Sequence, residues 1–304
     1  MKKVLVASVL FCATLFGSCR SENNPESNSA NNSAECPEIT VDDLKKMDLS
    51  NLWIGAIPDL DRVDFDDIPP AHRNDKEWLE YIKEHKMITW FERGELLGYV
   101  GDDFTRFYIH FSAVSKDVDD PLCYHMSGRV RIGDMIRNFD GVLHVENVEK
   151  EDCTTRDVAG IWTGWSISGR YEFSEFEGDW WQHSGAGKKT LAVLGGRHFM
   201  YLCADAAGKL YYDTTSMCGD GYHNNQWEGM RRDSATGVQT VCNWGDSRIP
   251  NSEKFDIGAG EFSPADEYRE NGWQSYCGRF NLDKDAVKRS FEEECRQWWI
   301  LGIQ

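Results

Sequence analysis

The chain has 304 residues, with 51 acidic against 33 basic side chains and a formal net charge of −18 at pH 7. So acidic a surface repels nucleic-acid phosphates and anionic lipid headgroups, which argues against DNA or RNA binding. Ten cysteines and 12 tryptophans are the other unusual features of the composition.

The chain begins with a segment that is typical of exported proteins. Two lysines precede an apolar run over residues 4–16, which is the layout of a secretory signal peptide. The sequence LFGSC over residues 15–19 resembles the lipobox of bacterial lipoproteins, with Phe16 where leucine is usual. The resemblance implies that residues 1–18 are removed and that Cys19 is lipidated, and plain secretion is the alternative.

Residues 19–36 are predicted to form a flexible tether, because they are rich in Asn, Ser and Glu and nearly lack apolar side chains. Acyl chains such as palmitate on Cys19 would anchor the protein stably in a membrane. The predicted location is the bacterial cell envelope, facing the periplasm or the cell exterior, and the sequence leaves the leaflet open.

The cysteines predict a disulfide framework. Apart from Cys12 in the signal peptide and Cys19, eight remain, and an even number in an oxidising compartment favours up to four disulfide bonds. The local pairs Cys123–Cys153 and Cys203–Cys218 are the first expectation. The eight candidates are Cys36, Cys123, Cys153, Cys203, Cys218, Cys242, Cys277 and Cys295.

Residues 37–86 are predicted to form a helical N-terminal segment. Thr40 followed by Asp43 has the pattern of a helix N-cap before a short helix. A second capping pattern precedes a predicted helix over residues 75–86.

Residues 87–304 are predicted to form a mainly β domain. In the run over residues 104–114, Phe107, Ile109 and Phe111 alternate with polar side chains, as in a half-buried strand. Similar runs follow to about residue 215, with short links and no helical pattern between them. The sequence therefore predicts an antiparallel sandwich or barrel-like meander.

Two features could subdivide or complete this domain. The sequence Ser-Gly-Arg recurs at residues 127–129 and 168–170, which allows two β units divided near residue 178. Towards the C-terminus we expect a β-hairpin, a short helix from Pro264 to Asn271, and a closing helix capped by Asp283. The closing helix has an apolar stripe that includes Cys295, so we expect a disulfide to tie it to the sheet.

The sequence contains none of the familiar catalytic, nucleotide-binding or zinc-binding signatures, so we predict no catalytic residue, cofactor or metal site. Glu175 and Glu177 would lie about 7 Å apart on one strand face. Carboxylate pairs at such spacings can hydrolyse glycosides, but they are also common on exposed strands. His110, His125 and His144 lie on predicted strands without metal-ligand spacing.

Tryptophans and one polar loop supply the candidate binding residues. Aromatic faces stack on sugars and protein partners, but they also fill β-domain cores, and both interpretations remain open. The loop over residues 213–225 gathers Asp213, Asp220 and His223 around Cys218, and loops on rigid sheets often carry binding sites. The tryptophans are Trp162, Trp165, Trp180, Trp181, Trp227, Trp244 and Trp273.

These observations predict a membrane-anchored extracytoplasmic lipoprotein with a non-catalytic binding or envelope-structural role. One alternative is a glycan-binding module, which would present coplanar Trp or Tyr faces on one surface. Another is a hydrolase of envelope or extracellular polymers, which would hold two carboxylates, or a carboxylate and a histidine, in a cleft. The expected partners are the membrane, through the lipid, and a glycan or an envelope protein.

Overall fold

The structure is a computed structural model that describes a short N-terminal segment and most of the predicted β domain. The described residues are 38–53, 96–157, 160–178, 189–213, 220–278, 281, 283–294 and 296–300, with no side-chain description within 152–162. The predicted signal peptide, Cys19, the tether and the predicted helix over residues 75–86 lie outside the described residues.

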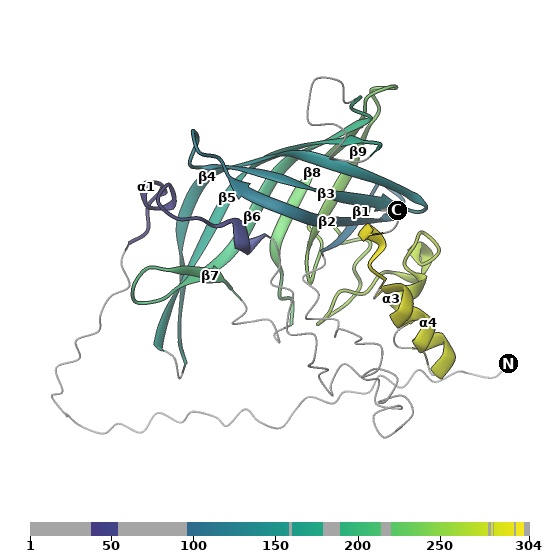
Figure 1. Cartoon of the computed structure of the whole chain (residues 1–304). Coiled ribbons are helices and arrows are strands. Elements are labelled where there is room, and N and C mark those ends of the chain that lie inside the picture. The colour runs from purple at the N-terminus through teal and green to yellow at the C-terminus, as the bar shows by residue number, and fades with distance from the viewer. Residues whose placement is uncertain are drawn as a thin grey trace, which may run out of the picture. The chain divides into compact units, whose positions relative to one another are not determined.

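The described strands form a single antiparallel sheet, confirming the predicted mainly β fold. Its nine strands follow the order β5-β4-β3-β2-β1-β9-β8-β6-β7. A further pairing of β5 with β6 closes the sheet into a barrel and leaves β7 beside the ring (Figure 1). The strands are β1 Leu97–Val100, β2 Thr105–Lys116, β3 Cys123–Ile132, β4 Met135–Asp157, β5 Gly160–Phe176, β6 Ala192–Ala204, β7 Leu210–Tyr212, β8 Asn224–Asp233 and β9 Gln239–Asp246.

The barrel interior is packed with apolar and aromatic side chains. Phe107, Ile109 and Phe111 of β2 are buried in this core, as their alternation predicts. Trp227 of β8 and Trp244 of β9 stack with ring centroids 5.5 Å apart and planes 14° apart. A small barrel filled in this way has no room for a ligand inside, which leaves its outer wall for a binding site.

The repeated Ser-Gly sequence marks β-bulges. Gly128 of β3 lies opposite the irregularity at residues 111–113, and Gly169 of β5 lies opposite the one at residues 145–147. A Cβ atom on Gly128 would lie 1.8 Å from a backbone oxygen of β2, and one on Gly169 would lie 2.2 Å from a backbone oxygen of β4. Only glycine fits such close approaches, and both sites belong to the same continuous sheet.

The N-terminal segment packs against one end of the barrel. Thr40 and Asp43 form the predicted capping box, and the short helix that follows is α1, Val41–Leu44. After the 3₁₀ turn η1, Ser50–Leu52, the ring of Trp53 is buried against Tyr124, with centroids 4.8 Å apart. The segment is therefore part of the same hydrophobic core.

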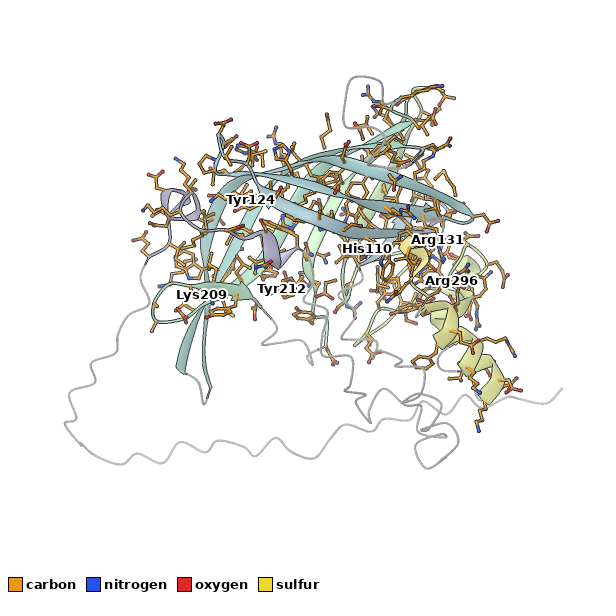
Figure 2. All side chains as sticks on the ribbon, in the orientation of Figure 1. His110, Tyr124, Arg131, Lys209, Tyr212 and Arg296 are labelled. Carbon is orange, nitrogen blue, oxygen red and sulfur yellow. The ribbon has the colours of Figure 1, made fainter. Side chains whose placement is uncertain are left out.

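The C-terminal segment covers the outer side of β2 and β3, which we call the covered face. It contains α3, Gln274–Gly278, α4, Lys284–Glu294, and the 3₁₀ turn η6, Trp298–Ile300. In α4, Val287 and Phe291 are buried as predicted. Figure 2 shows His110 and Arg131 of the barrel beside the segment that carries Arg296.

The helix predicted from Pro264 to Asn271 is wrong. Pro264 forms an isolated β-bridge with Asp256, and only the 3₁₀ turn η5, Asp266–Tyr268, follows it. The bridge holds the backbone extended at Pro264, so a helix cannot begin there. The hairpin of β8 and β9 is confirmed.

A buried ion pair ties the closing helix to the barrel. The guanidinium of Arg106 in β2 donates to both carboxylate oxygens of Glu294 at 2.5 and 2.6 Å, and both residues are buried. The same guanidinium lies over the rings of Tyr108, at 4.4 Å, and Trp273, at 4.8 Å. Cys295, the predicted anchor, lies outside the described residues.

The predicted disulfide framework is wrong for two of its eight cysteines. Cys123 is a free, partly buried thiol, so the expected Cys123–Cys153 bond is absent. Cys242 is a free thiol in the barrel core, where burial raises its pKa well above the usual range. Packing in the apolar core of the barrel therefore explains why a cysteine occurs at position 242 without a disulfide bond. Cys218, the expected partner of Cys203, lies outside the described residues.

Candidate binding groove

Four of the predicted binding tryptophans are core residues. Trp165 is 2% exposed, and Trp227, Trp244 and Trp273 are fully buried. They cannot form an exposed platform, so the binding interpretation is wrong for these four. The side chains of Trp162, Trp180 and Trp181 lie outside the described residues.

Trp273 belongs to a second hydrophobic cluster outside the barrel wall. Its ring lies 4.9 Å from Phe255 and 5.3 Å from Phe262, and its indole N–H donates to the carbonyl of Phe104 at 2.8 Å. This cluster fastens the chain after β9 to the outside of the barrel. Large aromatics here fill a core, as they often do.

The loop before β8 is only partly a binding candidate. The backbone carbonyl of Asp213 accepts hydrogen bonds from Tyr222 and Asn224 at 2.7 and 3.1 Å, so it serves the turn. Asp220 is exposed and lines no described pocket. His223 is exposed and lines a groove on the outer wall.

This binding groove lies between the outer side of β6 and β8 and the chain that follows β9. Its volume is about 600 Å³, within the range of small-molecule sites. In β6, Phe199 and Tyr201 point outward into the groove, while the alternating residues His198 and Met200 are buried and point into the barrel. The lining residues are Phe199, Tyr201, His223, Gln226, Glu228, Arg248, Ile249, Pro250, Asn251, Ser252, Glu253 and Asp256.

Three rings form one side of the binding groove. Tyr201 lies 4.7 Å from Phe199, with planes 83° apart, and 5.8 Å from His223, with planes 70° apart. The rings are angled to one another and are not the coplanar row that a glycan-binding module was expected to show. Sequence reasoning missed Phe199 and Tyr201, although two aromatics at positions i and i+2 of a strand share one face.

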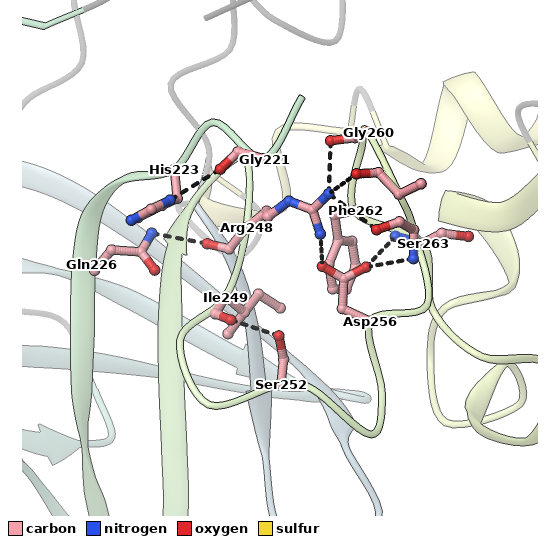
Figure 3. A network of polar contacts seen from close by, with 12 residues as sticks. Gly221, His223, Gln226, Arg248, Ile249, Ser252, Asp256, Gly260, Phe262 and Ser263 are labelled. Atoms are coloured by element: carbon pink, nitrogen blue, oxygen red, sulfur yellow. Dashed lines mark hydrogen bonds and ion pairs between the residues drawn. The ribbon is translucent and has the colours of Figure 1, made fainter. Parts of the chain in front are cut away.

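Arg248 organises the opposite wall. Its guanidinium pairs with Asp256 and donates to the carbonyls of Ala259 and Gly260 at 3.3 and 2.7 Å (Figure 3). The side-chain amide of Gln226 in β8 donates to the backbone carbonyl of Arg248 at 2.9 Å. These bonds fix the loop against the barrel, so the binding groove is formed before any ligand arrives.

Asp256 is paired with Arg248, but two other carboxylates in the binding groove have no such partner among the described residues. The side chains of Glu228 and Glu253 are exposed, and neither carboxylate forms a hydrogen bond or an ion pair with another described residue. Arg197 lies opposite Glu228 in the pairing of β6 with β8, but it does not line the groove. The lining therefore carries negative charge available to a ligand.

The glutamates considered for catalysis are not a matched pair. Glu175 is fully buried, with two hydrogen bonds of 2.7 Å from Arg231 and one of 3.2 Å from Arg137. Glu177 is exposed. Both oxygens of Glu175 are held by arginines and Glu177 is exposed, so the two carboxylates do not face one cleft as a catalytic pair would.

The three strand histidines occupy separate settings. His110 stacks on Trp299 at 4.1 Å, and burial lowers its pKa to about 4. His125 contacts Asp117 at 2.6 Å, and His144 contacts a different aspartate at 3.2 Å. In the described part of the chain, no three His, Cys, Asp or Glu side chains are grouped to hold a metal ion.

Comparison of the chain with protein-family models, curated proteins and solved structures finds no match. Within the described ranges, none of the helices has the length and apolar character needed to cross a bilayer.

Proposed function

We propose that this chain is a lipid-anchored envelope protein with a non-catalytic role, whose barrel presents the binding groove to an envelope saccharide. Cys19 supplies the anchor, the segment over residues 19–36 supplies the reach, and the barrel supplies a rigid wall. The observation that carries the proposal is an open groove, built before binding, in which aromatic rings and polar and acidic groups share one lining.

The groove has no coplanar row of rings, but it suits a single sugar ring, because the two sides of a sugar ring differ. Its C–H face packs on an aromatic ring, and its hydroxyl groups donate to carboxylates and carbonyls. Tyr201 lies between Phe199 and His223, and both neighbours make edge contacts that hold its ring. Glu228 and Glu253 supply acceptors that no described residue occupies.

The proposal is tested with the full-length protein in a polyoxyethylene detergent, which contains no sugar, on an array of bacterial and plant glycans. We expect binding to at least one glycan, and Tyr201→Ala should weaken it about tenfold through loss of ring contact. Mass spectrometry of the protein from the bacterial envelope should show an acylated N-terminal Cys19.

A matched control is Tyr211→Ala, which removes a tyrosine of β7 that does not line the groove. This variant should bind as the unaltered protein does. Binding to no glycan on the array, or equal losses of affinity in both variants, would contradict saccharide binding in this groove.

A further inference from the structure

The binding groove has an excess of acidic groups, and this excess bears on the kind of saccharide it would take. Among its lining residues, Arg248 and Asp256 are paired and cancel each other. Glu228 and Glu253 remain, with no ion pair to any described residue. A ligand that supplies the missing positive charge would gain more from this groove than a neutral one.

The aromatic wall favours the same kind of ligand. The planes of Phe199 and Tyr201 are 83° apart, and those of Tyr201 and His223 are 70° apart. Angled rings present more than one aromatic face to a ligand, and ammonium groups bind aromatic faces within about 6 Å of the centroid. Ring faces and carboxylates on one lining are the two features that recognise organic ammonium groups.

Two basic residues near the groove weaken its attraction for a positively charged ligand without removing it. Arg197 lies opposite Glu228 in the strand register, and Lys254 follows Glu253 in the chain. Both are exposed, and neither lines the groove. Their charges are screened by water, whereas Glu228 and Glu253 line the groove that a ligand would enter.

We propose that the groove selects saccharides that carry free amino groups over N-acetylated or acidic ones, with Glu228 and Glu253 as the residues that set this specificity. This inference rests on the proposed saccharide-binding function. An N-acetyl group has no charge to pair with the carboxylates, and an acidic sugar would be repelled by them.

The test compares two ligands with the same backbone, the hexamer of glucosamine and the hexamer of N-acetylglucosamine. Calorimetry uses the full-length protein in polyoxyethylene detergent at low salt and mildly acidic pH, where the free amino groups are protonated. We expect the glucosamine hexamer to bind about tenfold more tightly, and added salt to reduce the difference.

Glu228→Gln and Glu253→Gln should each reduce glucosamine-hexamer affinity about threefold, and the double variant should lose the preference. Both substitutions keep the side-chain shape at exposed positions, so the fold should be unaffected. The control Asp134→Asn removes an exposed carboxylate at the turn between β3 and β4, outside the groove, and should leave both affinities unchanged.

The outcomes separate the two proposals. Equal affinities for the hexamers, tighter binding of the acetylated one, or a preference that survives in the double variant would overturn the charge selection. If both hexamers bind equally and Tyr201→Ala weakens both, saccharide binding stands while the selection is wrong. If neither hexamer binds and the glycan array is silent, the proposed function itself is wrong.

Discussion

Two outer faces of the same barrel combine aromatic rings with charged side chains, yet their surroundings differ. On the covered face, Arg106 lies over Tyr108 and is neutralised by Glu294 from the C-terminal helix. In the binding groove, Glu228 lines the same groove as Tyr201 but has no ion-pair partner among the described residues. The same residue types are structural where a helix covers them and available to a ligand where none does.

The difference has a physical basis in hydration. A charge without water needs a partner of opposite sign, since burying it alone costs several kcal/mol. A charge at an open groove keeps its water until a ligand displaces it, so it can remain unpaired at little cost. The covered face should therefore respond to substitution through stability, and the groove through binding.

The largest expected effect is on the covered face. Glu294→Ala leaves Arg106 buried without a counter-charge, so the free energy of unfolding should fall by about 3–5 kcal/mol. Urea denaturation measures this change. The matched substitution in the groove, Glu253→Ala, should change it by less than about 0.5 kcal/mol. Similar losses in the two variants would mean that the faces do not differ as described.

A smaller loss of stability is expected when Arg248, which holds the loop after β9, is replaced. Arg248→Gln removes the pairing with Asp256 and bonds to the carbonyls of the following loop, at a cost of about 2 kcal/mol. Amide hydrogen exchange should accelerate over residues 248–263 and stay unchanged in β2. Arg232→Gln, an exposed arginine of β8, is the control. Unaltered exchange in the loop would show that the aromatic cluster alone holds it.

The smallest expected effect is on how the free energy of unfolding depends on pH. Burial lowers the pKa of His110 to about 4, so the unfolded chain takes up a proton near pH 6.5 that the folded protein does not. Stability should therefore fall as pH falls from about 6.5 towards 4. From about pH 7 to 5, His110→Gln should remove on the order of 1 kcal/mol of that loss, after discounting for partial exposure.

Thermal or urea unfolding at both pH values checks this prediction. His198, whose pKa burial lowers to about 3, contributes equally to both proteins and cancels in the comparison. An identical pH response in His110→Gln would show that the covered face opens readily to water. That outcome would remove the contrast with the groove.

Local sequence patterns predicted much of the fold. The alternation around Phe107, the capping box at Thr40 and the apolar stripe of the closing helix all appear in the structure. Each is a short-range pattern whose period matches its element. The helix predicted at Pro264 failed because a bridge to Asp256 overrode its local signals.

The candidate site was harder to predict. Of the predicted binding residues, His223 lines the groove, while Trp227 and Trp244 fill the core. Tryptophan suits a binding surface and a core equally well, so the residue type could not separate them. Phe199 and Tyr201 were detectable as a pair on one strand face, but nothing local shows which chain covers that face.

The sequence by itself determined the mainly β character, the inward face of β2, the capping box at Thr40, the apolar stripe of the closing helix and the acidic balance, because these depend on neighbours along the chain. Only the tertiary structure decided that β5 pairs with β6 to close the barrel, that Glu294 meets Arg106, and that the chain after β9 leaves a groove. Those contacts join residues far apart in sequence. They depend on which surfaces become buried together, and burial decides whether a ring or a charge serves the core or remains available to a ligand.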